Sequence, residues 1–372
     1  MDIYDKLSVK KLVNAFGTVT RIGGSLMLPE VLDAYCEAAT AFVDLNELLE
    51  KAGERIAQIT GAEAAYITSG AAAGMTIATA ACIAGTDPRM IARLPDTEGM
   101  KNEVIELNCH RVDYEQAVRA AGARIVEVGY AKRTLPWQME AAVTEKTAAI
   151  LYFVQSEKLT GSLPLATVVE IGKAAEIPVM VNAAAELPPV SNLHKFIDMG
   201  ADLVIFSGGK DIHGPQDSGL ILGRKDLIKA CALNGNPNHC IGRAMKASKE
   251  NIIALLKALE LYVEQDFDAE METWERQVQY LIDNLSGIPH IHVRRGFPAT
   301  PGIQPACIPR VYVELDGEEL QMTKAEVIAQ LRAGEPGVAV GESPTGVVLN
   351  PQMLRIGEEE IVAHKLRDVL GR

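Results

Sequence analysis

Lys210 is the residue of this sequence whose position most clearly asks for a chemical explanation. It stands in the segment VIFSGGKDIHGPQDSGLILG, residues 204–223, between an apolar run and a loop rich in glycine and proline. An amine that leaves a buried strand is costly to desolvate, so a functional reason for its position is expected. A desolvated lysine can act as a nucleophile toward carbonyl groups and as a base. The alternative is an ordinary solvated lysine in a loop.

Small or polar residues follow other apolar segments where strands are expected to end. The stretch TSGAAAG contains Ser69, Gly70 and Ala71, which lead from a predicted strand into a predicted helix. Small residues let the backbone approach an anion, and a helix start supplies free N–H groups and a positive dipole end. His110 follows VIELN, and Asn182 follows IPVMV. Taken singly, each has a plain structural interpretation as a packing helix, a core histidine or an asparagine turn.

These residues must be positioned by a parallel sheet, because strand and helix patterns alternate from about residue 48 to residue 230. The predicted strands are AEAAYITSG, VIELN, RIVEVG, TAAILYFV, IPVMVNAAA, ADLVIFSGG and SGLILG. Helical patterns such as AAAGMTIATAACIAG and LATVVEIGKAAE separate them. This alternation predicts an α/β fold with a mostly parallel sheet, in which ligands bind at the carboxyl ends of the strands.

The pattern changes from about residue 245, where a long helical stretch and then short strands and helices predict a small α+β domain. The predicted organisation is an N-terminal segment (1–47) that packs on the small domain, a large ligand-binding domain (48–244), and a linking helix with the small C-terminal domain (245–372).

Composition excludes several classes of partner. The chain has 372 residues and a formal net charge of −13, which disfavours binding to nucleic acid or anionic membranes. No run of about 18 apolar residues occurs, the N-terminus lacks a signal-like apolar core, and the six cysteines form no C-x-x-C pair. We therefore expect a cytoplasmic protein without a membrane span, a disulfide framework or a structural zinc.

The order of these features, a phosphate-type loop, a histidine, a polar strand end and Ser-x-x-Lys, resembles fold-type I enzymes that use pyridoxal 5′-phosphate (PLP). The segments VNAFGTVTRIGGS, FSGGKDIHGPQDSGLILGRKDLI, CIGRAMKASKE and GEEEIVAHKLRDVL resemble the selenocysteine-synthase-like group. Within that group they are similar to the D-glucosaminate-6-phosphate ammonia-lyases and their relatives. The likeness extends over nearly the whole chain and implies an aspartate aminotransferase-like PLP fold.

The resemblance implies a role for each residue of the site. Lys210 would form the Schiff base with PLP and, once released, act as the base that moves the α-proton. The remaining cofactor contacts would come from Ser69, Gly70, Ala71 and Ser207 at the phosphate, His110 stacked on the pyridine ring, Asn182 at its nitrogen, and Gln216. Substrate anions would meet Arg355, Thr20, Arg21, Arg243 and Lys246, because arginine in particular suits carboxylates.

Asn182 departs from the family pattern, which has aspartate at this strand position. A carboxylate keeps the pyridine nitrogen protonated, whereas the neutral amide of Asn182 can donate or accept a hydrogen bond but cannot pair with a charge. A less electron-withdrawing ring would follow. Chemistry that needs only a weak electron sink, an engineered substitution and a loss of activity are three explanations consistent with the sequence.

The implied reaction is a lyase reaction on an amino acid or amino sugar acid. Removal of the α-proton and loss of a β-substituent would give a 2-keto acid and ammonia. The general acid is open among His213, Tyr114 and Glu186. The alternatives are a racemase or epimerase, a selenocysteine-synthase-like transferase and an inactive homologue. Fold-type I sites usually lie between subunits, so a homodimer or higher homo-oligomer is expected.

Overall fold

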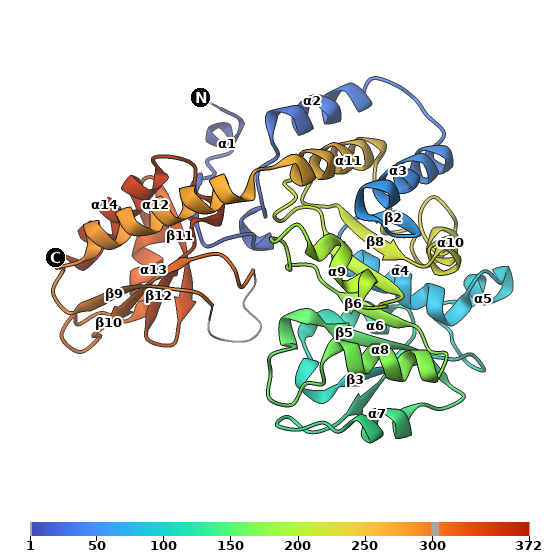
Figure 1. Ribbon diagram of the computed structural model, residues 1–372. Helices are drawn as coiled ribbons and strands as arrows, with labels where there is room; N and C mark the ends of the chain where they lie inside the picture. Colours follow the sequence, from blue (N-terminus) through green and yellow to red (C-terminus); the bar gives the residue numbers. More distant parts are fainter. Residues whose placement is uncertain (1, 299–304, 372) are drawn as a thin grey trace. The chain divides into compact units, whose positions relative to one another are not determined.

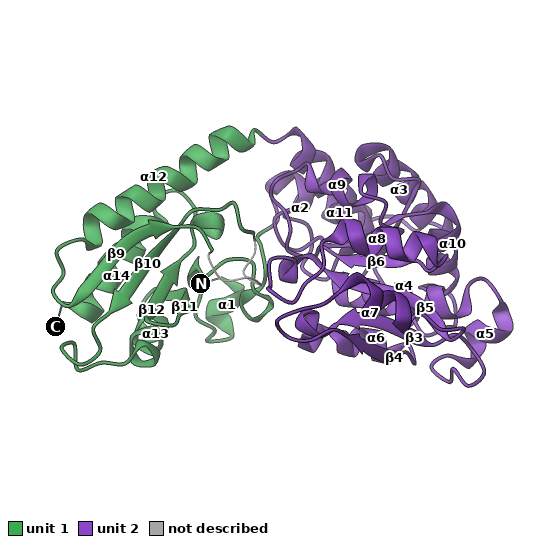
Figure 2. Cartoon of the chain, turned by 60° about the horizontal axis from the view of Figure 1, so that its bottom comes forward, with its two compact units in different colours: residues 1–26, 266–372 green, residues 27–265 purple. Residues whose placement is uncertain are grey.

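In a computed structural model, which describes residues 2–298 and 305–371, the chain forms two compact units (Figures 1 and 2). The larger unit is continuous in sequence and comprises Met27–Gln265. The smaller unit combines Met1–Leu26 with Asp266–Arg372. Within the described ranges, no helix is long and apolar enough to span a membrane.

A seven-stranded sheet forms the centre of the larger unit, in the order β2-β8-β7-β6-β5-β3-β4. β8 is antiparallel to both of its neighbours, whereas β7, β6, β5, β3 and β4 are mutually parallel. All strands except β8 therefore run in one direction, and their carboxyl ends share one edge. The strands are β2 (Ala64–Thr68), β3 (Glu103–Leu107), β4 (Arg124–Val128), β5 (Thr147–Phe153), β6 (Val179–Asn182), β7 (Leu203–Ser207) and β8 (Gly219–Gly223).

Helices cover this sheet because its strands are apolar on both faces. The helix α4 packs on β5, β7 and β8, while α8 and α9 pack on β6 and β7 (Figure 1). The α-helices of the unit are α2 (Pro29–Ala38), α3 (Leu45–Thr60), α4 (Ala71–Ala84), α5 (Pro88–Arg93), α6 (Gln116–Ala120), α7 (Pro136–Ala142), α8 (Leu165–Ala174), α9 (Asn192–Asp198), α10 (Lys225–Leu233) and α11 (Lys249–Glu264). The alanine-rich sequence of α4 gives it a largely buried surface rather than a polar outer face.

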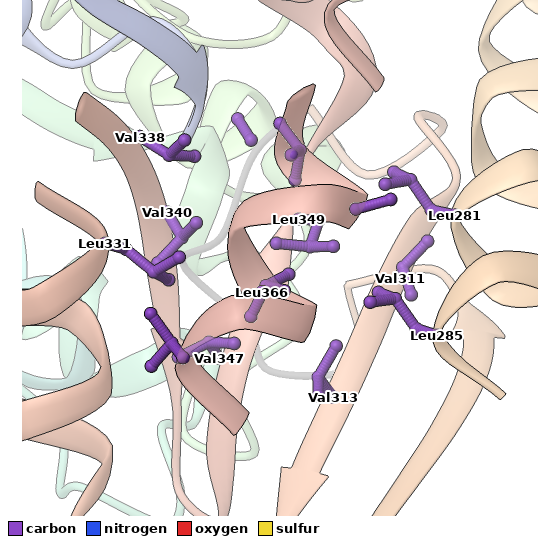
Figure 3. Packing of buried hydrophobic residues seen from close by; sticks show 14 of the residues in the cluster. Leu281, Leu285, Val311, Val313, Leu331, Val338, Val340, Val347, Leu349 and Leu366 are labelled. Carbon is purple, nitrogen blue, oxygen red and sulfur yellow. The ribbon is translucent and has the colours of Figure 1, made fainter. Parts of the chain in front are cut away.

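The smaller unit has its own five-stranded sheet and core. Its strands are β1 (Leu12–Ala15), β9 (Ile291–Gly296), β10 (Arg310–Leu315), β11 (Gly337–Ser343) and β12 (Gly346–Leu349), in the order β1-β11-β12-β10-β9. Its helices are α1 (Ile3–Lys6), α12 (Phe267–Leu285), α13 (Lys324–Ala333) and α14 (Glu358–Leu370). Leucine and valine side chains of these elements pack together, as Figure 3 shows for Leu281, Leu366 and Val340.

The domain boundaries differ from those expected from the sequence. β1 pairs in parallel with β11, so residues 12–15 belong to the sheet of the smaller unit. α2, however, packs on α11, and both helices lie in the larger unit. The first boundary therefore falls after Leu26 rather than near residue 47, and the second after Gln265 rather than residue 244. The first boundary depends on the long-range packing of α2 on α11, whereas the second coincides with Asp266, the N-cap residue of α12.

Candidate active site

Lys210 lies three residues after Ser207, the last residue of β7, in a tightly closed turn. Gly208 donates to the carbonyl oxygen of Ser218 (2.9 Å), and Gly214 donates to that of Gly208 (2.9 Å). A Cβ at Gly209 would lie 2.4 Å from the Cα of Gln216, so only glycine permits this approach. The turn holds the backbone of Lys210 at the carboxyl edge of the sheet.

The side chain of Lys210 is largely buried, and this changes its acid–base behaviour. Burial lowers the pKa of its amine below the usual value for lysine, and the negative charge of Glu186 partly opposes that effect. A lowered pKa increases the fraction of neutral amine at physiological pH. Lys210 therefore has the properties of a lysine that reacts with a carbonyl group or accepts a proton.

The start of α4 lies beside this edge and is open to an anion. Gly70, the N-cap residue, has a φ of +122° and gives the helix no side-chain cap. The hydroxyl of Thr68 donates to the carbonyl oxygen of Gly70 at 2.9 Å, which leaves the first N–H groups of the helix available. Ser69 and Ala71 are both half-buried.

Strand register places this helix start next to the lysine turn. Gly219 of β8 pairs with Thr68 on one side and with Ser207 on the other. A Cβ at Gly219 would lie 2.7 Å from the carbonyl carbon of Gly70 and 2.9 Å from the nitrogen of Ala71. A glycine at position 219 is therefore needed for the loop to rest on the sheet edge.

Asn182 ends β6, and its amide has a defined orientation. Its Oδ1 accepts a hydrogen bond from the N–H of Ala184 at 3.1 Å, and its Nδ2 donates to Sδ of Met75 at 2.8 Å. Asn182 also pairs with Ile205 of β7, two residues before Ser207. The amide therefore lies on the strand next to the one that leads to Lys210.

The structure thus brings together five of the predicted positions at one edge of the larger unit: Ser69, Gly70, Ala71, Asn182 and Ser207, around Lys210. Glu186, from the loop after β6, joins them through its charge interaction with Lys210. Gln216 forms part of the same turn through its backbone, while its side chain is exposed.

His110 lies directly after β3 and is held by residues of β5 and the loop that follows it. It is fully buried, with Nε2 2.8 Å from Oγ of Ser162 and Nδ1 accepting from the N–H of Phe153 at 3.3 Å. Its ring meets Tyr152 edge-on, with centroids 4.6 Å apart. Burial lowers the pKa of His110 to about 4. Ser162, Phe153 and Tyr152 therefore orient the ring of His110, and its stacking on the cofactor stays a prediction.

The predicted substrate residues occupy several elements. Arg243 and Lys246 are exposed in the loop between α10 and α11, where Arg243 approaches Oδ1 of Asn236 at 3.5 Å. In the smaller unit, Thr20 and Arg21 are exposed in the short 3-10 helix Thr20–Ile22.

Arg355, also in the smaller unit, precedes α14 and pairs with Glu358, with Nε 2.8 Å from Oε1. Its side chain is 73% exposed despite this pair. An exposed guanidinium held by one carboxylate can still meet a second anion, so the pair is compatible with the predicted contact to substrate.

Sequence reasoning missed two side chains that shape the site, Thr68 and Met75. Thr68 fixes the carbonyl of Gly70, and Met75 receives the amide of Asn182. The position of Met75, one helical turn after Ala71, is the only sequence signal that could have indicated it.

The residues present fit PLP. The open start of α4 suits a phosphate, the buried amine of Lys210 suits an aldehyde, and the amide of Asn182 offers hydrogen-bonding groups to a ring nitrogen. All three lie at the carboxyl edge of one sheet, where α/β proteins of this topology bind ligands.

Comparison with known proteins supports this assignment. The pattern of the L-seryl-tRNA selenium transferase (SelA) family matches residues 12–276. The chain is 38% identical to the D-glucosaminate-6-phosphate ammonia lyase of Salmonella typhimurium, covering 99% of this chain and 98% of that protein. It is 33% identical to a 5′-C-glycyluridine monooxygenase-decarboxylase of a Streptomyces species, covering 99% and 92% of the two chains.

Solved structures agree with the sequence comparisons. A structure of D-glucosaminate-6-phosphate ammonia-lyase matches with a TM-score of 0.86 and 37% identity, covering 100% of this chain and 98% of that one. The aspartate aminotransferase of Thermotoga maritima matches with a TM-score of 0.57 and 16% identity, covering 99% and 94%, which supports the fold alone.

Proposed function

The chain belongs to the SelA family and is a PLP-dependent lyase, and we propose that its substrate is an amino sugar acid. The proposed reaction removes the α-proton and the β-hydroxyl of a 2-amino-3-hydroxy acid. Hydrolysis of the resulting enamine then gives a 2-keto-3-deoxy acid and ammonia. The observation that carries the proposal is the buried amine of Lys210 beside the open start of α4.

Lys210 has two proposed tasks. It carries the cofactor, and after the substrate displaces it, its amine takes the α-proton. PLP, when bound, supplies a ring that withdraws electrons from the α-carbon of the attached amino acid. Burial supports the second task, because a lysine with a lowered pKa is neutral more often and can accept a proton.

The other residues at this edge of the sheet are proposed to hold the cofactor and to orient it. The N–H groups at the start of α4, with the hydroxyls of Ser69 and Ser207, hold the phosphate. The amide of Asn182 contacts the ring nitrogen and adds no charge there, so the ring remains a weaker electron sink than with aspartate. Gln216 is proposed as a further cofactor contact, and the stacking of His110 on the ring stays a prediction.

The substrate anions are proposed to bind arginine and lysine side chains outside this edge. Arg355, with Thr20 and Arg21, is proposed to receive the carboxylate, and Arg243 and Lys246 are proposed to receive a further anionic group such as a phosphate. All five side chains are exposed or largely exposed, which supports a role in contacting a ligand.

A homodimer or larger homo-oligomer is also proposed. Large apolar side chains are exposed near α2 in the larger unit, including Phe42 (104%), Val43 (53%) and Leu32 (43%). Burial of such side chains against a second copy would stabilise an assembly.

Product analysis tests the proposed function. Purified protein loaded with PLP is incubated with D-glucosaminate or its 6-phosphate in heavy water, and ammonia, keto acid and residual substrate are quantified by NMR. We expect ammonia and 2-keto-3-deoxy acid in equal amounts. Solvent-labelled substrate of mixed stereochemistry without keto acid would indicate a racemase instead, and oxygen uptake would indicate oxidative chemistry.

A further inference from the structure

Glu186 is a buried carboxyl group in the loop that follows Asn182. Its side chain belongs to a residue only 8% exposed. The backbone holds it in place at both ends, because its N–H donates to the carbonyl oxygen of Ala183 (3.1 Å) and its carbonyl accepts from Nδ2 of Asn192 (2.6 Å). The backbone position of Glu186, and with it the point from which its side chain starts, is therefore fixed at the carboxyl end of β6.

The charges around Glu186 come from three segments. Lys210 comes from the turn after β7, Lys195 from α9, and Lys158 with Glu157 from the loop after β5. Burial raises the pKa of Glu186 to about 7, and the positive charge of Lys210 is the largest opposing influence. The group is therefore present in both its acid and its base forms near neutral pH.

A β-elimination from a hydroxy acid needs such a group. The C–O bond breaks with its electron pair on oxygen, and hydroxide is a poor leaving group unless a proton arrives as it departs. Lys210 is occupied with the α-proton in the proposed reaction. A second acid near Lys210 can supply this proton, because the α- and β-carbons are adjacent, and it leaves the amine of Lys210 free for the α-proton.

We propose that Glu186 is the general acid of this elimination and that its carboxyl group protonates the hydroxyl leaving the β-carbon. This inference rests on the proposed function. The proton passes from Oε of Glu186 to the departing oxygen, which leaves as water, and the carboxylate regains a proton from solvent before the next turnover.

The two other acids considered from the sequence are less buried than Glu186. Tyr114 is 61% exposed and lies in the short 3-10 helix Asp113–Glu115. His213 has a positive φ of 58° in the turn, and its N–H donates to the carbonyl oxygen of Lys210 at 3.0 Å. Of the three, Glu186 combines burial with a charge interaction with the amine of Lys210.

The variant Glu186→Gln separates proton removal from elimination. In heavy water, with D-glucosaminate 6-phosphate as the probe, NMR measures exchange of the α-proton and formation of keto acid in the same sample. We expect exchange by Lys210 to persist, while keto acid formation falls by about 100-fold or more. Glu186→Asp should recover part of the elimination. Glu170→Gln, which changes an exposed carboxylate of α8, is the matched control and should behave as the wild type.

A second measurement needs no turnover. A negative charge on Glu186 favours a positive charge on the nitrogen of Lys210, whether that nitrogen is free or joined to the cofactor, so Glu186→Gln should shift the pH-dependent absorbance change of the substrate-free holoenzyme to lower pH. Equal losses of exchange and elimination, or no loss of either, would overturn the assignment of Glu186 as the acid. Absence of keto acid from the wild type would instead refute the proposed function, and the role of Glu186 with it.

Discussion

At the scale of single residues, the amide of Asn182 is oriented by its neighbours. Only its oxygen can accept from the N–H of Ala184, so Nδ2 must be the atom that faces Met75. In the proposed site, a neutral amide beside the ring nitrogen of the cofactor would favour the unprotonated form of that nitrogen, because the amide can donate an N–H but carries no negative charge. The reaction would then depend more strongly on removal of the α-proton by Lys210 and on the group that protonates the leaving hydroxyl.

The variant Asn182→Asp tests this argument. The carboxylate keeps the acceptor for Ala184 and adds a negative charge that protonates the ring nitrogen. We expect stronger long-wavelength absorbance with substrate, because the negative charge formed at the α-carbon spreads further into the ring. Absorbance spectra of the loaded variant provide the measurement, and Glu170→Gln, at an exposed position of α8, is the control. An unchanged spectrum would show that Asn182 does not contact the ring nitrogen.

At the scale of secondary-structure elements, the contact between β8 and the start of α4 positions the loop that is proposed to bind the phosphate. The loop Ser69–Ala71 rests directly on Gly219, with no space for a side chain at that position. This close approach fixes the distance between the start of α4 and the sheet edge at which Ser207 and Lys210 lie. The proposed binding of the phosphate would therefore depend on a glycine in a strand that makes no proposed contact with the ligand itself.

The variant Gly219→Ala should weaken cofactor binding. Its methyl group would meet the carbonyl carbon of Gly70 at 2.7 Å, so the loop must move away from the sheet. We expect the dissociation constant for PLP, measured by absorbance titration, to rise about tenfold or more, which corresponds to about 1.4 kcal/mol. Gly317→Ala is the control, because its added Cβ would find an ordinary contact of 3.4 Å in the smaller unit. Unchanged affinity would show that the loop does not hold the phosphate.

The sequence predicted the elements of this edge because their signals are local. Apolar runs and the glycines after them indicate the strand ends that carry Ser207 and Lys210. The surroundings of His110 could not be predicted, because they depend on Ser162 and Tyr152, which are distant in sequence. For the same reason, the first domain boundary, after Leu26, could not be predicted, because it depends on the packing of α2 on the distant helix α11.

At the scale of the whole molecule, buried ionisable groups of the larger unit link its stability to pH. Both carboxylate oxygens of Glu106 are buried and have no hydrogen-bond partner in the described part of the chain. Burial, reinforced by the negative charge of Glu115, raises the pKa of Glu106 to about 8. The folded unit thus retains a proton that the unfolded chain releases above its ordinary pKa of 4.5.

His110 acts in the opposite sense. Its folded pKa of about 4 lies below the ordinary value of 6.5, so between these values the unfolded chain binds a proton that the folded unit does not. Stability contributed by neutral His110 is therefore lost as the pH falls from 6.5 toward 4. The contribution of neutral Glu106 is lost as the pH rises from 4.5 through 8. Together, these two groups favour maximum stability in weakly acidic solution.

The variant Glu106→Gln should remove the alkaline part of this dependence. Glutamine has nearly the same volume and stays neutral at every pH. The variant therefore lacks the proton that the folded wild type releases only above about pH 8. We expect the wild type to lose on the order of 2–4 kcal/mol of unfolding free energy between about pH 6 and pH 9 through this group, and the variant to lose correspondingly less. Denaturant unfolding followed at both pH values measures the difference.

Comparing the change with pH, rather than absolute stability, cancels the constant cost of burying an amide in place of a neutral carboxyl group. Glu170→Gln, at an exposed position, should leave the wild-type pH dependence intact. Parallel pH profiles for wild type and Glu106→Gln would mean that Glu106 does not hold its proton in the folded unit.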